Sequence, residues 1–207
     1  RLPVPVSNEY QEVAGVTLLP KPEWEQEVPP QGRIAVVRFP VLRPGQSAWA
    51  FLFAQVRSRE FSPSRRLLER TLPAAERARC LGPSVKLDPR APEIARQAEA
   101  IAFDAEDPYV IVQAIAEYLS RGFTYELDGR QDDARTVLAT RRGSCSELSR
   151  LYVALCRARG IPARFAAGSR LRFRAGDIYV DTVHHRWTEV FLPRHGWFPV
   201  DISMAVD

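Results

Sequence analysis

The chain has 207 residues, of which 45% are hydrophobic and 26% charged, so it can bury an ordinary globular core without a disulfide framework or a structural metal. The net charge of +4 is spread along the chain, and its densest clusters are the pairs Arg65-Arg66 and Arg141-Arg142, which argues against a nucleic-acid-binding protein. A membrane-spanning helix is also excluded by the sequence, because no run of about 18 apolar residues occurs.

The first third of the chain is rich in proline and is predicted to be extended. Residues 33–40 and 47–57 have the character of short strands, and Arg43-Pro44-Gly45-Gln46 supplies a turn between them. We therefore predict a β-rich N-terminal extension over residues 1–86 and a second domain at residues 87–207. The extension either binds a partner or substrate or supports the second domain.

Helical periodicity begins in the second domain. Residues 91–103 and 107–119 carry apolar side chains at steps of three and four, and Pro108 lies near the start of the second helix, where a missing amide costs nothing. A short extended segment follows at 123–125, and residues 132–142 are predicted to form a short helix.

A longer helix is predicted after Ser144, which is its expected N-cap. Glu147 lies three residues on, in the Ser-x-x-Glu pattern of a capping box, while Gly160 ends the helix and Pro162 prevents its resumption. Strands are then expected at 163–173, 184–190 and 197–202. Helices followed by strands indicate an α+β fold rather than alternating βαβ units.

The three cysteines, Cys80, Cys145 and Cys156, leave at least one thiol free, because their number is odd. Cys145 and Cys156 are eleven residues apart on one predicted helix, about 16 Å at the helical rise, which is beyond disulfide reach. Cys80 could pair with either of them, so cysteine usage leaves the cellular compartment open.

Cys145 falls in the first turn of the predicted helix. The thiolate is the reacting form of cysteine, and both the positive end of a helix and a neighbouring imidazolium stabilise it. Gly143 leaves room at this position for a substrate backbone. The alternative interpretation is a small buried residue without a reactive role.

A histidine and an aspartate can meet in the hairpin of the last two predicted strands. His185 and Trp187 lie on one face of the first strand. Asp201 shares that face if it pairs directly with His185, which leaves residues 191–195 as the loop, or if it is displaced by two residues. A displacement by one would place it on the other face. We therefore predict a loop of odd length.

These three residues fit an acyl transfer. His185 would take the thiol proton and later return it to the leaving amine, and Asp201 would hold the imidazole in one tautomer. The amide of Cys145 would contribute to an oxyanion hole. This chemistry requires no metal or other cofactor. The competing interpretation, a metal site of Cys145, His184 and His185, lacks paired ligand spacing.

Four segments resemble those of bacterial transglutaminase-like cysteine enzymes, and the resemblance extends over residues 89–201. The segments are Gly143-Ser144-Cys145-Ser146-Glu147-Leu148, Arg159-Gly160-Ile161-Pro162-Ala163-Arg164, His185-Arg186-Trp187-Thr188-Glu189-Val190 and Gly196-Trp197-Phe198-Pro199-Val200-Asp201. The resemblance implies a transglutaminase-like, papain-like α+β core, in which the nucleophile helix packs on an antiparallel sheet.

The resemblance also implies a catalytic triad of Cys145, His185 and Asp201. Tyr125 matches an aromatic position that helps to stabilise the oxyanion in such enzymes. Together with Ser144 and Trp187, it makes up the expected oxyanion and substrate-binding set.

The expected activity is the hydrolysis of amide bonds in a protein or peptide substrate through a thioester acyl-enzyme. A transglutaminase shares the same triad and transfers the acyl group to an amine, while a non-catalytic binding module would keep the fold without the reaction. The resemblance, together with a chain that begins at Arg1 rather than at methionine, favours an extracytoplasmic bacterial protein, while a cytoplasmic enzyme with free thiols fits the chemistry equally well.

Overall fold

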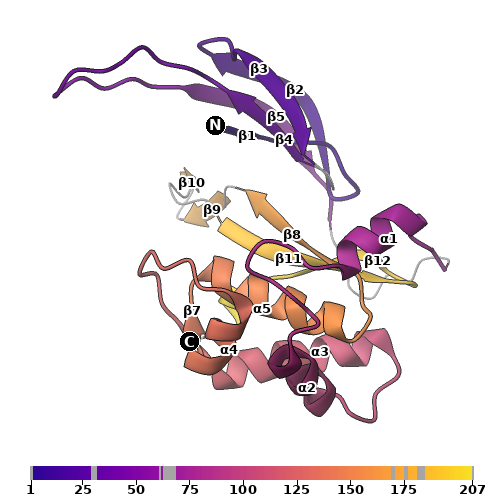
Figure 1. The fold of residues 1–207 in the computed structure, drawn as a ribbon. Coiled ribbons are helices and arrows are strands. Elements are labelled where there is room, and N and C mark those ends of the chain that lie inside the picture. Colours follow the sequence, from indigo (N-terminus) through magenta and orange to yellow (C-terminus); the bar gives the residue numbers. More distant parts are fainter. Residues whose placement is uncertain are drawn as a thin grey trace. The chain divides into compact units, whose positions relative to one another are not determined.

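The computed structural model divides the chain into two compact units, Arg1–Ser62 and Pro63–Asp207, each described here by itself (Figure 1). The structure describes residues 2–28, 32–60, 62, 69–168, 171–174, 177–180 and 185–206. Within these residues, every helix is too short or too polar to cross a bilayer.

Two small antiparallel sheets make up the first unit, as expected of a β-rich N-terminal part. β4 (Gly32–Val36) is the central strand of one sheet, between β1 (Leu2–Val4) and β3 (Trp24–Val28). β2 (Gln11–Leu19) pairs with β5 (Phe51–Ser58) in the other. Val4 and Ala35 are buried in the three-stranded sheet.

The predicted turn at residues 43–46 is present. The Gln46 amide donates to the carbonyl oxygen of Arg43 (N···O 3.0 Å), and Gly45 has a φ of +83°, which glycine adopts without a Cβ clash. The strands on either side, β4 and β5, pair with other strands of the described sheets rather than with each other. The connection between them is long enough to let each strand find a different neighbour.

The helices of the second unit begin and end near their predicted capping residues. Asp107 caps the third helix by accepting a hydrogen bond from the amide of Tyr109 (2.8 Å), with Pro108 in the first turn. Gly160, with a φ of +71°, follows the fifth helix. The bounds are α1 (Ala74–Leu81), α2 (Pro92–Ile101), α3 (Pro108–Gly122), α4 (Ala134–Thr140) and α5 (Cys145–Ala158).

Three antiparallel strands form the main sheet of the second unit, in the order β12 (Gly196–Val200), β11 (His185–Leu192) and β8 (Ala163–Gly168). The single strand predicted at 163–173 is divided, because β8 ends at Gly168. Leu171–Arg174 then forms β9, which pairs with β10 (Asp177–Val180) as a separate hairpin. The last predicted strand ends at Val200, and a 3-10 helix, η1 (Ile202–Met204), follows it.

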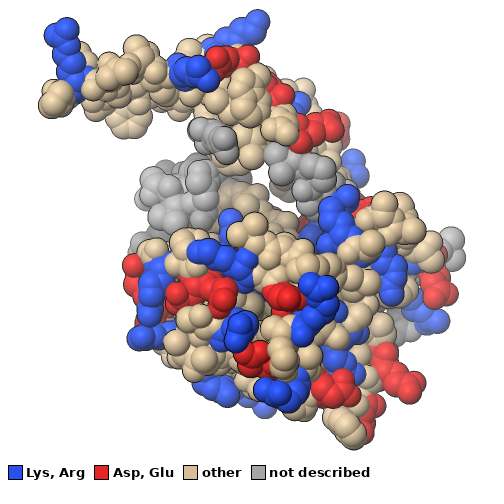
Figure 2. Space-filling model, in the orientation of Figure 1, with Lys and Arg blue, Asp and Glu red and all other residues tan. Residues whose placement is uncertain are grey.

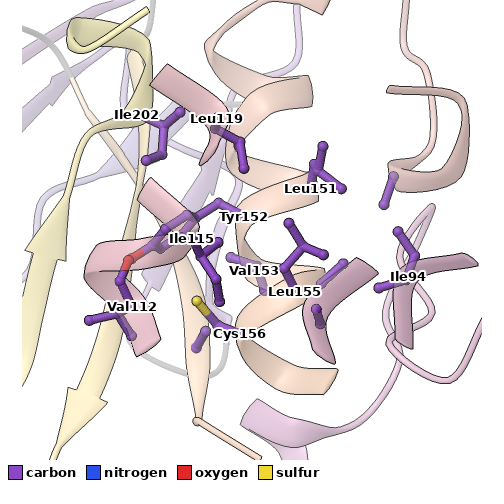
Figure 3. Packing of buried hydrophobic residues seen from close by; sticks show 14 of the residues in the cluster. Ile94, Val112, Ile115, Leu119, Leu151, Tyr152, Val153, Leu155, Cys156 and Ile202 are labelled. Carbon is purple, nitrogen blue, oxygen red and sulfur yellow. The ribbon is translucent and has the colours of Figure 1, made fainter. Parts of the chain in front are cut away.

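Helix α5 is the centre of the core. Its predicted apolar face is fully buried, and the hydroxyl of Tyr152 donates to the carbonyl oxygen of Val112 in α3 (3.1 Å). The helix packs against α2, α3 and α4 as well as against β8 and β11, and the buried side chains interdigitate around it (Figure 3). The predicted α+β architecture, in which the helix that begins at Cys145 packs on an antiparallel sheet, is therefore confirmed.

Helix α1 is attached to this second unit. Glu76 lies 3.4 Å from Nη1 of Arg164 in β8, and the carbonyl oxygen of Gly82 accepts a hydrogen bond from Arg157 in α5 (2.6 Å). Cys80 packs with Phe191 and Trp197. By contacts, the chain therefore divides at residues 62 and 63, upstream of the boundary after residue 86 that the sequence led us to expect.

Candidate active site

The capping box at the start of α5 orders the backbone around Cys145. The amide and the hydroxyl of Ser144 both donate to Oε2 of Glu147, with an N···O distance of 2.8 Å for the amide. The amide of Ser146 donates to the Ser144 hydroxyl (3.3 Å). Cys145 is the first helical residue, so its amide has no partner within the helix. This amide is placed to bind an anion at the helix end, where the helix dipole adds positive charge.

Gly143 is required here by close packing. A Cβ at this position would lie 2.7 Å from Cβ of Glu147, much closer than non-bonded carbon atoms approach. Gly143 therefore lets the capping carboxylate fold back over the helix start. The sequence suggested a different reason, space for a substrate backbone.

Tyr125 is brought to the same place by a short parallel pairing of β6 (Thr124–Tyr125) with β7 (Arg142–Gly143). Tyr125 pairs with Gly143, and the amide of Glu126 donates to the carbonyl oxygen of Gly143 (3.0 Å). The Tyr125 side chain is 37% exposed. It thus lies on a segment paired with the residues that lead into Cys145.

His185 and Asp201 are in contact. Nε2 of His185 lies 2.5 Å from Oδ2 of Asp201, and their side chains are 14% and 28% exposed. A carboxylate only accepts hydrogen bonds, so Nε2 is the donor to an ionised Asp201, and Nδ1 is the basic nitrogen of the neutral ring. The other carboxylate oxygen of Asp201 accepts a hydrogen bond from the hydroxyl of Ser203 (2.7 Å).

The hairpin that joins these two residues has the predicted odd-length loop. Leu192 pairs with Gly196, which leaves the three residues 193–195 between the strands. The His195 amide donates to the carbonyl oxygen of Leu192 (2.9 Å), and Gly196 has a φ of +73°, the usual geometry of a three-residue hairpin loop. Thr188 pairs with Val200, so continuing the register places Asp201 opposite Trp187. Of the two allowed registers, the displacement by two is the one observed.

Two contacts set the direction of α5 relative to β11. The hydroxyl of Ser149 donates to the carbonyl oxygen of Arg186 (3.4 Å), near the start of both elements. The amide of Phe191 donates to the carbonyl oxygen of Pro162 (2.8 Å), near the end of β11 and just beyond the end of α5. The two elements therefore run in the same direction. Cys145 lies one turn before Ser149 on the same helix face, at the end of the sheet where His185 begins β11.

Trp187 supports the imidazole from the side. Its ring stacks on that of His185, with centroids 6.1 Å apart and an interplanar angle of 21°. The ring also covers Gly168, where a Cβ would lie only 3.2 Å from the indole. Trp187 is therefore held between β8 and the histidine.

The other two cysteines are unsuited to nucleophilic chemistry. Burial raises the pKa of the Cys156 thiol far above its ordinary value, and burial also raises the pKa of the Cys80 thiol. Both side chains are almost fully covered, at 0% and 1% exposed, whereas Cys145 retains 7%. All three cysteines are free thiols.

His184 and His195 are the two other histidines, and His184 belongs to the metal-site interpretation that the sequence left open. His184 lies outside the described residues; among the residues that are described, no cluster of three His, Cys, Asp or Glu side chains could hold a metal. His195 lies in the hairpin loop of residues 193–195. Its ring is half-buried and packs against Tyr109 and Phe198, with centroids 5.7 Å and 5.8 Å away.

Ser203 is a site residue that sequence reasoning missed. Its only signal was the spacing Asp-x-Ser, which commonly forms a local side-chain hydrogen bond at a turn. Serine and aspartate occur together so often near turns that the spacing has little predictive value on its own.

The sequence profile of the Transglutaminase-like superfamily matches residues 95–202, just over half of the 207-residue chain. The chain belongs to this superfamily. The match spans α2 to η1 and includes Cys145, His185 and Asp201. It thus covers the predicted resemblance almost completely.

The transglutaminase-like fold recurs in solved structures. A protein from Cytophaga hutchinsonii, described as a "Putative Cysteine Protease", aligns with a TM-score of 0.67 and 19% identity over 97% of this chain and 69% of its own. The periplasmic domain of TgpA from Pseudomonas aeruginosa aligns with a TM-score of 0.59 and 23% identity over 75% of this chain and 55% of that one.

A curated relative is YebA of Bacillus subtilis (strain 168), which is 32% identical over 45% of this chain. That match covers 15% of YebA, so the chain corresponds to a small part of that relative's length.

Proposed function

We propose that this chain is a cysteine-dependent amide hydrolase, with Cys145 as nucleophile, His185 as general acid–base and Asp201 as the residue that orients the imidazole. The observation that carries the proposal is the 2.5 Å contact between Nε2 of His185 and Oδ2 of Asp201. Membership of the transglutaminase-like superfamily supports a cysteine enzyme.

In the first half of the reaction, Nδ1 of His185 accepts the thiol proton of Cys145, because Nε2 is committed to Asp201. The thiolate sulfur attacks the carbonyl carbon of the substrate amide. The oxyanion that forms accepts a hydrogen bond from the amide of Cys145, assisted by the Tyr125 hydroxyl. Ser144, which the sequence also suggested for this role, donates through both its amide and its hydroxyl to Glu147 and so orders the helix start instead. The imidazolium then donates its proton to the leaving amine, the carbon–nitrogen bond breaks, and a thioester remains on the sulfur.

In the second half, a water molecule replaces the departed amine. His185 takes one proton from this water as its oxygen attacks the thioester carbon, and returns the proton to the sulfur as the carbon–sulfur bond breaks. The products are a carboxylic acid and the free thiol of Cys145. Asp201 stabilises the imidazolium in both halves, and Trp187 keeps the ring in one orientation by stacking on it.

The transglutaminase reaction differs only in the acceptor, which is a primary amine instead of water. The description of the Cytophaga hutchinsonii neighbour favours a protease, and on this basis we propose hydrolysis. Incubation of a glutamine-containing peptide mixture with and without an added primary amine distinguishes the two by mass spectrometry. Free carboxylic acid in both samples supports hydrolysis, whereas an amine adduct that displaces the acid contradicts it.

The catalytic assignment is tested by the rate of iodoacetamide alkylation at each cysteine across about pH 5 to 9, a range that brackets ordinary and activated thiols. In the folded protein, we expect Cys145 to react at the acidic end while Cys80 and Cys156 do not, because burial raises the pKa of both and covers them. The variant His185→Ala should slow Cys145. His195→Ala, which changes the half-buried histidine of the hairpin loop, is the matched control and should not.

If Cys145 reacts no faster than Cys80 and Cys156, and His185→Ala has no effect, the catalytic proposal is wrong and a binding module with this fold takes its place.

We also propose an extracytoplasmic location, supported by the periplasmic domain of TgpA among the structural neighbours. Fusion to a phosphatase that is active only outside the cytoplasm tests this location: an inactive fusion would contradict it.

A further inference from the structure

The first unit carries a projecting segment, residues 38–49, which we call the arm. It connects β4 to β5 and reverses direction at the turn of residues 43–46 (Figure 1). Residues 38–47 are all exposed, and so is Trp49. The exposed fraction is 98% for Val41, 71% for Trp49 and 44% for Leu42. The outer end of this unit is therefore apolar where a soluble surface is usually polar.

The apolar surface continues from the arm onto one face of the β2–β5 ribbon. Phe51 and Phe53 lie two residues apart in β5, so their side chains point to the same side of the strand, and Trp49 lies two residues before it. Phe51 and Phe53 are 52% and 58% exposed, with ring centroids 6.3 Å apart. Leu19 pairs with Phe51 from β2 and is 53% exposed. A connected apolar patch of this kind marks an interaction surface.

The charge at the turn of the arm is positive. Residues 28–59 include five arginines and no aspartate or glutamate. Three of these arginines are paired with glutamates of the neighbouring segments: Arg33 with Glu25 (3.1 Å), Arg38 with Glu23 (3.2 Å) and Arg57 with Glu12 (3.7 Å). Arg43 occupies the turn of the arm and is exposed. The outer end of the unit accordingly shows blue side chains against tan, without red (Figure 2). A partner that suits this surface is therefore apolar, with negative charge near the exposed Arg43.

An anionic lipid bilayer offers an apolar hydrocarbon layer with negatively charged headgroups directly beside it. Tryptophan and arginine concentrate at the boundary between headgroups and hydrocarbon, where an indole or aliphatic side chain enters the apolar layer and a guanidinium remains beside a phosphate. Pro40 and Pro44 lack amide hydrogens, so the arm has fewer backbone donors to desolvate when it enters the interface.

We propose that the arm, together with the exposed face formed by Leu19, Phe51 and Phe53, inserts shallowly into the headgroup region of an anionic membrane. The few apolar side chains involved make this a reversible, peripheral attachment that weakens with salt, because part of the attraction is between exposed charges. The attachment is independent of the catalytic proposal, since no residue of the candidate active site takes part in it.

The experiment is co-sedimentation of the full chain with vesicles of phosphatidylglycerol and phosphatidylethanolamine, compared with vesicles of phosphatidylcholine alone. The test variant is Val41→Asp in the arm, and the matched control is Val85→Asp, a valine that is 85% exposed in the second unit. Both positions are too exposed for the change to disturb the fold, and circular dichroism of the variants verifies this.

We expect the wild type and Val85→Asp to bind the anionic vesicles, and Val41→Asp to bind at least about tenfold more weakly, because a charge replaces an inserted apolar group. Binding should also fall when salt is raised from about 0.1 M to 0.5 M. Failure of the wild type to bind, or equal binding by the two variants, overturns the proposal. So does a concentration-dependent dimer, detected by sedimentation velocity, that Val41→Asp dissociates, because a second copy would then cover the patch.

Discussion

The buried ion pair of Arg164 and Glu189 joins the strands that carry the candidate site. Nε of Arg164 in β8 donates to Oε2 of Glu189 in β11 (2.7 Å), and the two residues pair directly across the strands. Their side chains are only 6% and 7% exposed. The guanidinium also stacks on Trp197 of β12, 3.7 Å from the ring centroid. One cation therefore contacts all three strands of the sheet.

The cost of breaking this pair depends on which partner is removed. Removing one member of a buried pair costs about 3–5 kcal/mol, because the other charge is left uncompensated. Arg164 has a second carboxylate nearby, Glu76 at 3.4 Å, and the Trp197 ring, so Glu189→Leu should fall near the lower end of this range. Arg164→Leu takes the ion-pair partner from a buried carboxylate and should fall near the upper end. The double variant leaves neither charge buried and should lie within about 1–2 kcal/mol of the wild type.

The free energy of unfolding in urea, followed by far-ultraviolet circular dichroism, measures these differences. This signal reports the second unit, because the helices of the described chain all lie there. Arg135→Leu, which breaks the exposed pair with Glu93, is the control and should cost far less than either single variant, because exposed ion pairs add little stability. If the double variant loses as much stability as the two single variants combined, the uncompensated charge is not the cause and the reasoning fails.

Three further predictions concern the site. Asp201→Asn should slow Cys145 alkylation near neutral pH by about 10- to 150-fold, the equivalent of the roughly 1.5–3 kcal/mol of a hydrogen bond to a charged group. The control Asp104→Asn, at an exposed position, should leave the rate unchanged, and an unaffected rate in a folded Asp201→Asn variant would exclude Asp201 from the site. Ser203→Ala should reduce the same rate severalfold and Ser203→Thr should restore it, because the threonine hydroxyl can still donate to Asp201; equal rates in the two variants would mean that the 2.7 Å bond has no orienting role. Gly143→Ala should lower the thermal unfolding temperature, since the added Cβ collides with the capping carboxylate chain at 2.7 Å, and an unchanged unfolding temperature would show that the helix start relaxes freely.

The parts of this structure that depend on short-range chemistry were predictable from the sequence. Ser144 and Glu147 specify the start of α5 within four consecutive residues, and the capping box forms as predicted. Gly160 marks its end through one backbone conformation. The strands after α5 were also expected from their local pattern, whereas the packing of the helix on their sheet was implied only by the family resemblance.

The register of the β11–β12 hairpin shows where local reasoning ends. The alternation of side chains along a strand has a period of two, so it is the same for a direct His185–Asp201 pairing and for a displacement by two residues. The sequence pattern therefore predicted the shared face and the odd loop and left both registers open. The choice between them lies in the three-residue loop, which closes because Gly196 adopts a positive φ.

Long-range partners were the least predictable. The strands on either side of the turn at 43–46 each pair with a different strand, because a long connection imposes no neighbour on them. Arg164 and Glu76 are far apart in the chain, and nothing about either residue type indicates that one cation will contact three strands and a helix. Such contacts depend on the completed fold, so they could be found only in the structure.

Helix α5 combines two demands that usually lie on different elements. Its first residue, Cys145, sits at the candidate site, while residues 148–156 are buried on every side. A nucleophile must be held within fractions of an ångström of its partners, and a short loop cannot provide that rigidity. A fully packed helix can, because moving its first turn means moving side chains that interdigitate with α2, α3, α4 and the sheet. Cavity-forming changes far along the helix should therefore reduce Cys145 reactivity before they unfold the protein, since a slight tilt misaligns the thiol while most of the core contacts survive.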